Sequence, residues 1–323
     1  MPAFEFNQDI ADEHWLVKNL IPLGHLCTLL AQSGSGKSFL IEGLAVHVVY
    51  GIDFCGLETT AGDALIIDQD TPTPVLNKRI VRMAKVLGSQ AKNKLYIESM
   101  KGYSLDSNKL PGIISNYNPR LVIIDSLHSL CGSRLNPNST KDMSIWAKVK
   151  SQCLTEDRTI IVSHHITEKL SYTIDQLMSK DNHISGMGNS AIKQQADTEF
   201  ILASSLNDNR IDKIYLRAIA KRQTIPERPV VIRMFEPDDT CQFEFGGYYE
   251  ADLTECETDV LLLFRERQQE FTIKEVYESM GHKYGENKVR EALTKLDKKS
   301  ILAMGHYKSN LFKYRMPRNK ESV

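Results

Sequence analysis

Short apolar runs alternate with longer amphipathic stretches from Gly24 to about Phe245. The apolar runs have the length of strands, and they are Leu26–Leu30, Ala64–Ile67, Leu121–Ile124, Thr159–Val162, Glu199–Ala203 and Ile214–Ile219. Several of them are continuous and contain β-branched residues. Continuous apolar strands are typical of parallel sheets that helices cover on both faces. The stretches between them include three of helix length, Lys37–Tyr50, Thr73–Gly88 and Lys141–Leu154. The pattern predicts an α/β fold with a mostly parallel sheet.

The pattern changes near Gly246. Three stretches with helical spacing follow, Glu257–Arg267, Ile273–Met280 and Glu286–Lys298, and Thr272 is a candidate N-cap for the second. The runs Ile301–Tyr307 and Leu311–Met316 then flank a three-residue turn, which predicts a hairpin. Three helices and a hairpin are the element order of a winged helix-turn-helix. We predict a core at 1–246 with a lead-in at 1–24, a linker at 247–256 and a small α+β winged-helix domain at 257–323.

Composition agrees with two ordinary globular domains. The chain has 323 residues, 41% of them hydrophobic and 25% charged, which excludes a disordered, collagen-like or disulfide-stapled chain. We find no apolar run near the ~20 residues that a membrane helix needs, and Met1–Asn19 is too polar for a signal peptide. The six cysteines form no C-x-x-C pair. We therefore expect reduced thiols, no membrane partner and a cytoplasmic location.

The strongest motif lies between the first apolar run and the first helix. It reads Ala31-Gln32-Ser33-Gly34-Ser35-Gly36-Lys37-Ser38, with Phe39 next, and matches a Walker A loop except for alanine at the first glycine position. Small residues let backbone N–H groups turn inward around a phosphate, at a helix N-terminus that favours anions. Lys37 can reach the β- and γ-phosphates, and Ser38 can ligate Mg²⁺. These residues predict a nucleotide site for ATP and Mg²⁺.

Acidic residues end two later apolar runs. Leu121–Ile124 leads into Asp125, which has the position of a Walker B carboxylate that holds Mg²⁺ through water. Ala64–Ile67 leads into Asp68 and Asp70, and ligands in α/β sheets bind at the carboxyl ends of strands. Either acid could polarise a water molecule. Asp70 comes just before Thr71-Pro72, so it could also serve only to form a turn.

Together these motifs resemble the RecA-like ATPases, and more narrowly the RepA-type hexameric helicases of plasmids and phages. The resemblance covers Trp15 to about Phe235 and includes the runs Trp15–Lys18, Ile21–Gly24, Gly36–Phe39, Asp125–Leu127, Ser163–His165, Ser190–Ile192 and Ala196–Thr198. It implies that Asp70 is the general base, although the family has glutamate there and Asp70 is one methylene shorter. Asp68 remains the alternative.

The resemblance also implies how hydrolysis couples to DNA. It makes His164 the sensor of the γ-phosphate, whereas an ordinary pair of histidines at a strand end is the alternative for His164 and His165. The polar stretch 168–192 would line a ring's central channel and hold single-stranded DNA through cations. We therefore list Lys180 in this stretch, and His165 and Lys193 beside it, as candidate contacts. A solvated surface loop is the alternative for these residues.

The resemblance assigns a role to Lys221 and Arg222 as well. In ring helicases, basic residues at this place reach the γ-phosphate of the neighbouring subunit. The family separates them by one residue, whereas here they are adjacent, and we favour Arg222 as the finger. A pair of surface charges at the end of a strand is the alternative. A site shared in this way implies a homo-oligomer, which we expect to be a hexameric ring.

The C-terminal domain carries a concentration of cations. The third helix and hairpin include Lys288, Arg290, Lys295 and Lys308. A basic helix with a basic wing tip is typical of binding to duplex DNA, and binding to a replication protein is the alternative. The chain as a whole has a net charge of −1, from 40 basic and 41 acidic residues, which alone would argue against a nucleic-acid partner. The local segregation of charge removes that objection.

We therefore expect an ATP-hydrolysing, DNA-translocating motor, a hexameric replicative helicase of a plasmid, phage or other mobile element. Two other classes fit the same motifs. One is a RecA-like recombination or repair ATPase that does not unwind DNA. The other is an ATP-switched adaptor or regulator that binds DNA.

Overall fold

The fold is described from a computed structural model that covers residues 14–88, 90–104, 109–131, 145–166, 172–179, 194–208, 210–220, 228–237, 239–249, 254–267, 269–298, 302–308 and 311–315. Within these residues the core is a 9-stranded sheet of order β11-β10-β9-β8-β3-β7-β6-β4-β5. Its strands are β3 (Leu26–Ala31), β4 (Ala64–Asp68), β5 (Leu95–Ser99), β6 (Leu121–Asp125), β7 (Thr159–His165), β8 (Thr198–Asn207), β9 (Arg210–Ala220), β10 (Val230–Phe235) and β11 (Gln242–Tyr248). A small antiparallel pair precedes them, β1 (Trp15–Val17) and β2 (Ile21–Pro22).

The sheet is parallel from β5 to β8, which confirms the predicted fold class. From β8 to β11 the pairing is antiparallel. The sequence pattern did not predict β5, β10 or β11, and it gave no sign of the antiparallel extension. An apolar run records that a strand is buried but not its direction, so only the short turn between β8 and β9 could have indicated the reversal.

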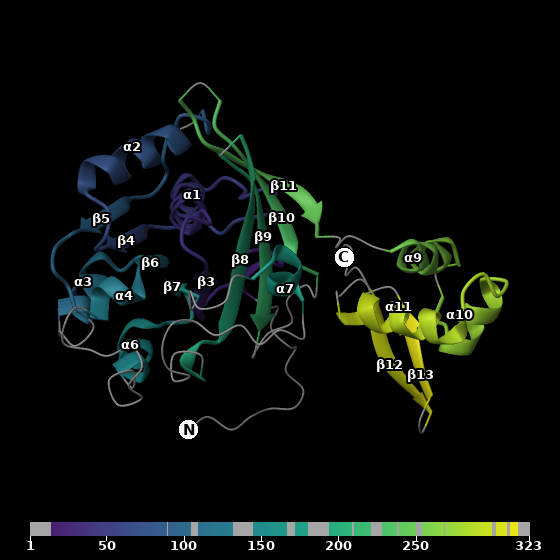
Figure 1. Cartoon of the computed structure of the whole chain (residues 1–323). Coiled ribbons are helices and arrows are strands. Elements are labelled where there is room, and N and C mark those ends of the chain that lie inside the picture. Colours follow the sequence, from purple (N-terminus) through teal and green to yellow (C-terminus); the bar gives the residue numbers. More distant parts are fainter. Residues whose placement is uncertain are drawn as a thin grey trace.

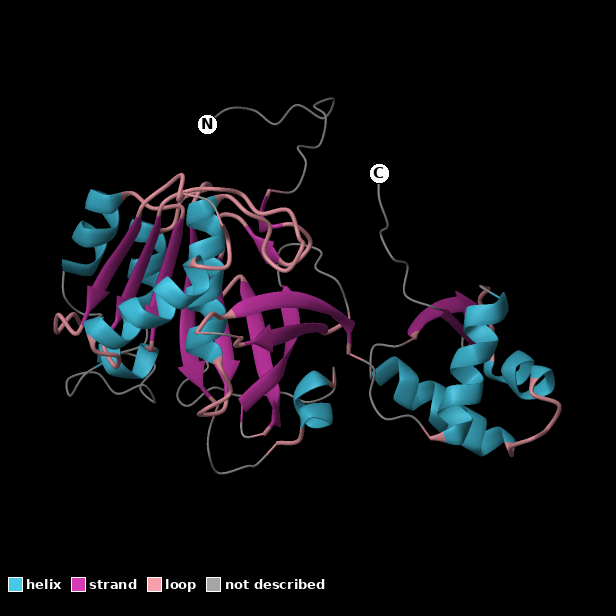
Figure 2. Cartoon of the chain, turned by 90° about the horizontal axis from the view of Figure 1, so that it is seen from above, coloured by secondary structure: helices cyan, strands magenta, loops and turns pink. Residues whose placement is uncertain are grey.

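Helices cover both faces of the sheet (Figure 1). Residues of α1 (Lys37–Tyr50) and α2 (Thr73–Ala84) join one apolar cluster on one face. Clusters on the other face include residues of α3 (Lys109–Tyr117), α4 (Leu127–Cys131), α6 (Ile145–Cys153) and α7 (Ile174–Met178). Figure 2 shows the strands between the two layers of helices, as a RecA-like core requires.

Helix α1 is buried on nearly every side, as its apolar composition predicts for a core helix. Gly43 lets it approach the sheet closely, because a Cβ there would come within 2.3 Å of the Phe243 ring on β11. The helix ends at Gly51, whose φ of 64° is left-handed and easily adopted by glycine. This packing fixes the helix that follows the phosphate loop.

The C-terminal residues form a separate group of three helices and a hairpin (Figure 2). The elements are α9 (Glu255–Arg267), α10 (Ile273–Ser279), α11 (Glu286–Lys298), β12 (Ala303–Lys308) and β13 (Leu311–Arg315). They enclose an apolar cluster of their own, with Phe264, Val289 and Leu293 fully buried. Thr272 caps α10 in a capping box with Glu275, as its position predicted.

Candidate nucleotide site

The phosphate loop joins the end of β3 to the start of α1. Gly34 and Gly36 have φ values of 73° and 85°, in the left-handed region that favours glycine. The Ser35 hydroxyl donates to the Gln32 carbonyl at 2.7 Å and braces the turn. A Cβ on Gly36 would come within 2.7 Å of the Ile211 side chain on β9, so a larger residue here would also displace that side chain. The backbone therefore presents the start of α1 to the carboxyl edge of the sheet.

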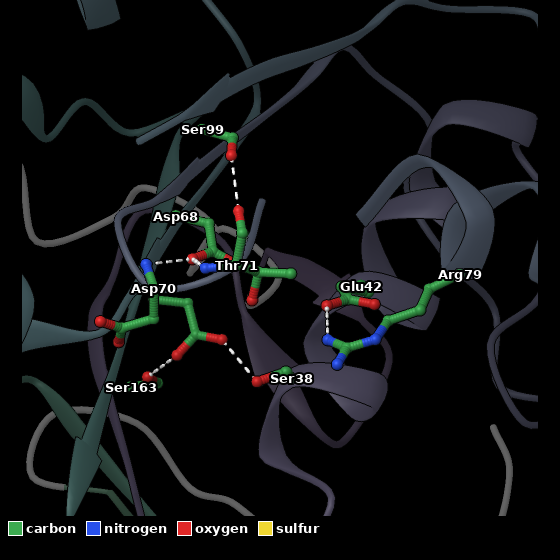
Figure 3. A network of polar contacts seen from close by, with 9 residues as sticks. Ser38, Glu42, Asp68, Asp70, Thr71, Arg79, Ser99 and Ser163 are labelled. Atoms are coloured by element: carbon green, nitrogen blue, oxygen red, sulfur yellow. Dashed lines mark hydrogen bonds and ion pairs between the residues drawn. The ribbon is translucent and has the colours of Figure 1, made fainter. Parts of the chain in front are cut away.

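Asp125 links two serines at this edge. Its carboxylate accepts the Ser38 hydroxyl at 2.6 Å on one oxygen and the Ser163 hydroxyl on the other. Figure 3 shows both serines, Ser38 from α1 and Ser163 from the sheet. The Asp125 side chain is buried, so its negative charge is held close to the Ser38 hydroxyl with little water between them. The two predicted metal ligands are thus brought together.

The two acids at the end of β4 and just after it, Asp68 and Asp70, have different environments (Figure 3). Asp68 is buried, and its Oδ1 accepts the backbone N–H groups of Asp70 and Thr71 at 2.7 and 2.8 Å. Burial raises the pKa of Asp68, although these hydrogen bonds oppose the rise. Asp70 is exposed and accepts the Ser126 hydroxyl at 3.1 Å. Asp68 therefore shapes the turn, while the carboxylate of Asp70 is available to solvent.

Of the two histidines at the end of β7, His165 lies beside the phosphate loop. Its Nδ1 is 3.5 Å from the Lys37 ammonium. Burial lowers the pKa of His165, and the charge of Lys37 lowers it further, which favours a neutral ring that can accept from Lys37. Burial also lowers the pKa of Lys37, with Asp125 and Asp70 opposing. His164 is buried and alternates to the other side of the strand.

The profile of the AAA domain family matches residues 3–169. The chain belongs to this AAA-domain family. The match spans the P-loop, the Asp68–Asp70 turn and Asp125, which the geometry above brings to one edge of the sheet. The protein is accordingly a P-loop ATPase of the AAA-domain family, with a mostly parallel sheet flanked by helices as its core.

One solved structure similar to this AAA-domain ATPase is the flagellar accessory protein FlaH from Methanocaldococcus jannaschii. It has 15% sequence identity and a TM-score of 0.43, over 70% of this chain and 92% of that one. A comparison with curated proteins gave no match. Among the described residues, no helix is both long and apolar enough to cross a bilayer.

The donor groups of the AAA-domain ATPase fit ATP with Mg²⁺, which P-loop ATPases generally bind. Mg²⁺ prefers oxygen ligands and keeps several waters, so one hydroxyl and one carboxylate suffice beside the nucleotide's phosphates. Ser38 and Asp125 supply that pair. No group of three or more His, Cys, Asp or Glu side chains in the described part of the chain could form a protein-only metal cage.

A further ionisable pair lies on α1 and α2, and the sequence analysis did not identify it (Figure 3). Glu42, one turn after Ser38, is buried and accepts from Arg79 at 3.1 Å. The Arg79 guanidinium also lies 4.9 Å from the centre of the Phe39 ring. Burial raises the pKa of Glu42 to about 8, with Arg79 opposing the rise. A glutamate inside an otherwise apolar helix could have suggested a buried polar contact, but not its partner.

A pocket of about 420 Å³ lies in the antiparallel part of the sheet. Ile211, which packs against Gly36, is one of its walls. The other lining residues come from the end of β8, the start of β9, and β10 and β11 with the segment that joins them, and include Arg210, Phe235 and Glu244. The sequence pattern did not identify this pocket, because its walls lie in the strands and turns of the antiparallel extension.

Several predicted site residues lie outside the described residues: Lys180, Lys193, Lys221 and Arg222. Of the predicted C-terminal contacts, Lys288, Arg290 and Lys295 are exposed on α11. Each has a local partner: Lys288 lies over the Tyr284 ring, Arg290 is 3.3 Å from Glu286 and Lys295 is 3.9 Å from Glu257. Lys308 ends β12, and its side chain is not described. The cations of α11 are therefore partly neutralised by neighbours on the same group of helices.

Proposed function

We propose that this ATPase is a DNA-translocating motor, a hexameric replicative helicase of a plasmid, phage or other mobile element. The observation that carries the proposal is the contact between Lys37 and His165. His165 ends β7, and the chain continues directly into the stretch 168–192, where we predict the contacts with single-stranded DNA. A change at the phosphates thus has a short covalent route to the DNA-binding segment. The geometry favours His165 over His164 as the sensor.

The described residues supply the parts of a hydrolytic site. The amides of the phosphate loop and Lys37 bind the phosphates, and Ser38 and Asp125 would hold Mg²⁺, which neutralises charge that develops on phosphate oxygens. Asp70 is exposed at the same edge and would orient the attacking water as general base. In the proposed ring, Arg222 of a neighbouring subunit would complete the site. The hydrolysis of ATP to ADP and phosphate would then depend on assembly.

The pocket beside Gly36 is the proposed place for the nucleotide base. It offers one aromatic side chain, Phe235, and one guanidinium, Arg210, either of which could lie against a flat ring. Because Ile211 touches both the pocket and the phosphate loop, a nucleotide could occupy the two at once. The C-terminal helices and hairpin would serve as a winged helix that binds duplex DNA or a replication protein.

A forked-duplex assay tests this proposal against the other two classes. We expect ATP- and Mg²⁺-dependent unwinding by the full chain and none by Lys37→Ala. DNA-stimulated hydrolysis without unwinding would indicate a recombination or repair ATPase instead. Hydrolysis that does not respond to single-stranded DNA would contradict both and leave the ATP-switched regulator. Imaging of particles with ATP would show whether a six-fold ring forms.

A further inference from the structure

Helix α1 carries Ser38, and helix α2 directly follows the turn with Asp70, the proposed general base. Ser38 stands in the first turn of α1, and Glu42 follows it by four residues, on the same side of the helix. Helix α2 begins at Thr73, directly after the turn that holds Asp70. The position of Asp70 relative to Ser38 therefore depends on how these two helices are held together.

Arg79 makes the polar connection between them. Its guanidinium donates to Glu42 at 3.1 Å and lies over the ring of Phe39, so it contacts α1 one residue and one turn after Ser38. Among the described residues this is the one ion pair that joins α1 to α2. Glu42 is 2% exposed, so its carboxylate is shielded from water, which would otherwise compete with Arg79 for it.

The next arginine of α2 provides a contrast. Arg82 is of similar exposure, but it pairs with Glu236 and Asp239, between β10 and β11, and not with α1. Both arginines anchor α2 to the core. Arg79 alone of the two connects it to the helix of the phosphate loop.

We propose that Arg79 and Glu42 are positioning residues for hydrolysis, which hold the Asp70 turn at its working distance from Ser38 and the phosphate loop. The inference rests on the proposed ATPase mechanism, with Asp70 as the base. Neither residue touches the reacting atoms. Their loss should therefore lower kcat and leave the binding of ATP largely intact, because the phosphate loop itself is unchanged. A displacement of about 1 Å at a reacting group can cost up to about 100-fold in rate.

The test compares Arg79→Met with Arg82→Met in the full chain. We expect Arg79→Met to lower kcat at least about 10-fold with KM for ATP changed less than about twofold, and Arg82→Met to retain the parent kcat. Arg79→Lys keeps the charge and should recover part of the rate. An Arg79→Met enzyme with the parent kcat would overturn the proposal.

A double variant separates positioning from the cost of an unpaired buried group. Arg79→Met leaves the buried carboxyl of Glu42 without its hydrogen-bond partner, which could impair folding by itself. Glu42→Gln combined with Arg79→Met replaces that carboxyl with a group that cannot ionise, and should still show the low kcat. Recovery of the parent kcat in the double variant would mean that the unpaired carboxyl, and not the lost tether, caused the defect.

Hydrogen exchange gives a readout that does not depend on activity. The amides of Asp70 and Thr71 donate to Asp68, and we expect them to exchange faster in Arg79→Met than in the parent or in Arg82→Met. Unchanged exchange of these two amides would contradict the proposed link between Arg79 and the Asp70 turn, even if kcat fell. If the parent chain does not hydrolyse ATP at all, the proposed function fails, and the exchange comparison still supports or refutes the link between Arg79 and the Asp70 turn.

Discussion

Ser38 donates its hydroxyl hydrogen to Asp125 at 2.6 Å, which joins the first turn of α1 to the end of β6. These two residues would hold Mg²⁺, Ser38 through its hydroxyl and Asp125 through water, and the ion would stabilise charge on the phosphates. Asp125→Asn keeps the shape and removes the charge, so we expect hydrolysis to fall at least about 100-fold, or about 2.7 kcal/mol in the barrier. A titration of ATPase rate against Mg²⁺, with thermal melting as the folding check, measures this. If Asp125→Asn hydrolyses ATP at the parent rate and requires the same Mg²⁺ concentration as the parent, Asp125 is not a ligand.

Substitutions of Asp68 and Asp70 should have different effects, the first on stability and the second on kcat. Asp70→Ala removes the exposed carboxylate, and we expect kcat to fall about 100-fold or more while nucleotide affinity and stability stay near the parent. Asp68→Ala leaves two backbone N–H groups without their acceptor, and we expect a loss of about 2 kcal/mol in the free energy of unfolding. Single-turnover hydrolysis and urea denaturation distinguish the two. If Asp68→Ala alone abolished the chemical step in a stable protein, the assignment would be reversed.

Substitutions of the two histidines should have different effects: that of His165 on the response of hydrolysis to DNA, and that of His164 on stability. His165 contacts Lys37, so we expect His165→Ala to bind ATP but to lose the stimulation of hydrolysis by single-stranded DNA. His164 is buried, so we expect His164→Ala mainly to lower the melting temperature. The measurement is ATPase rate with and without oligonucleotide, beside a melting curve. Loss of DNA stimulation in the His164 variant only would return the sensor role to that residue.

The sequence predicted the parallel half of the core well. The apolar runs and the loop Gly34–Ser38 identified β3, β4, β6 and β7, and α1 has the bounds that its pattern predicted. These elements are buried, so their apolar composition was enough to predict them. β5 reads Leu-Tyr-Ile-Glu-Ser and is only partly buried, which is why its pattern gave no strand.

The rest of the site depends on contacts that spacing does not encode. Alternation along β7 puts Ser163 and His165 on one side and His164 on the other, but the sequence does not say which side faces Lys37. Glu42 and Arg79 lie 37 residues apart and meet only because α1 and α2 pack together. The family resemblance implied the ATPase, but it did not supply these pairings.

The exposed cations of α11 give a prediction for duplex DNA. Lys288→Ala should weaken binding about equally for different sequences and should reduce the slope of log K against log salt by about 1, because one phosphate contact is lost. Lys274→Ala in α10 is the control, since Lys274 is also exposed and lies on a neighbouring helix, where it pairs with Glu278. Fluorescence anisotropy at several salt concentrations measures both slopes. Equal slopes for the two variants and the parent would contradict a DNA contact at Lys288 and favour a protein partner.

Glu42 should make stability depend on pH in a defined direction. Burial raises its pKa in the folded state to about 8, from the ordinary value of 4.5 that a glutamate has in an unfolded chain. Below pH 4.5 the carboxyl is protonated in both states and contributes nothing. As pH rises from 4.5 to 8 the unfolded chain releases the proton first, so the folded state is progressively disfavoured, and above pH 8 the cost is constant.

Glu42→Gln does not titrate and should escape that cost. Relative to the parent, the variant should therefore gain stability between about pH 5 and about pH 9, by roughly 4 kcal/mol on the basis of ~1.36 kcal/mol per pKa unit. Urea denaturation at both pH values measures the difference, in which the other titrating groups cancel. Glu58→Gln, at an exposed glutamate of the same domain, controls for the loss of a carboxylate. Profiles for Glu42→Gln and the parent that stay parallel across this range would show that Glu42 is ionised in the folded protein at neutral pH, held so by Arg79.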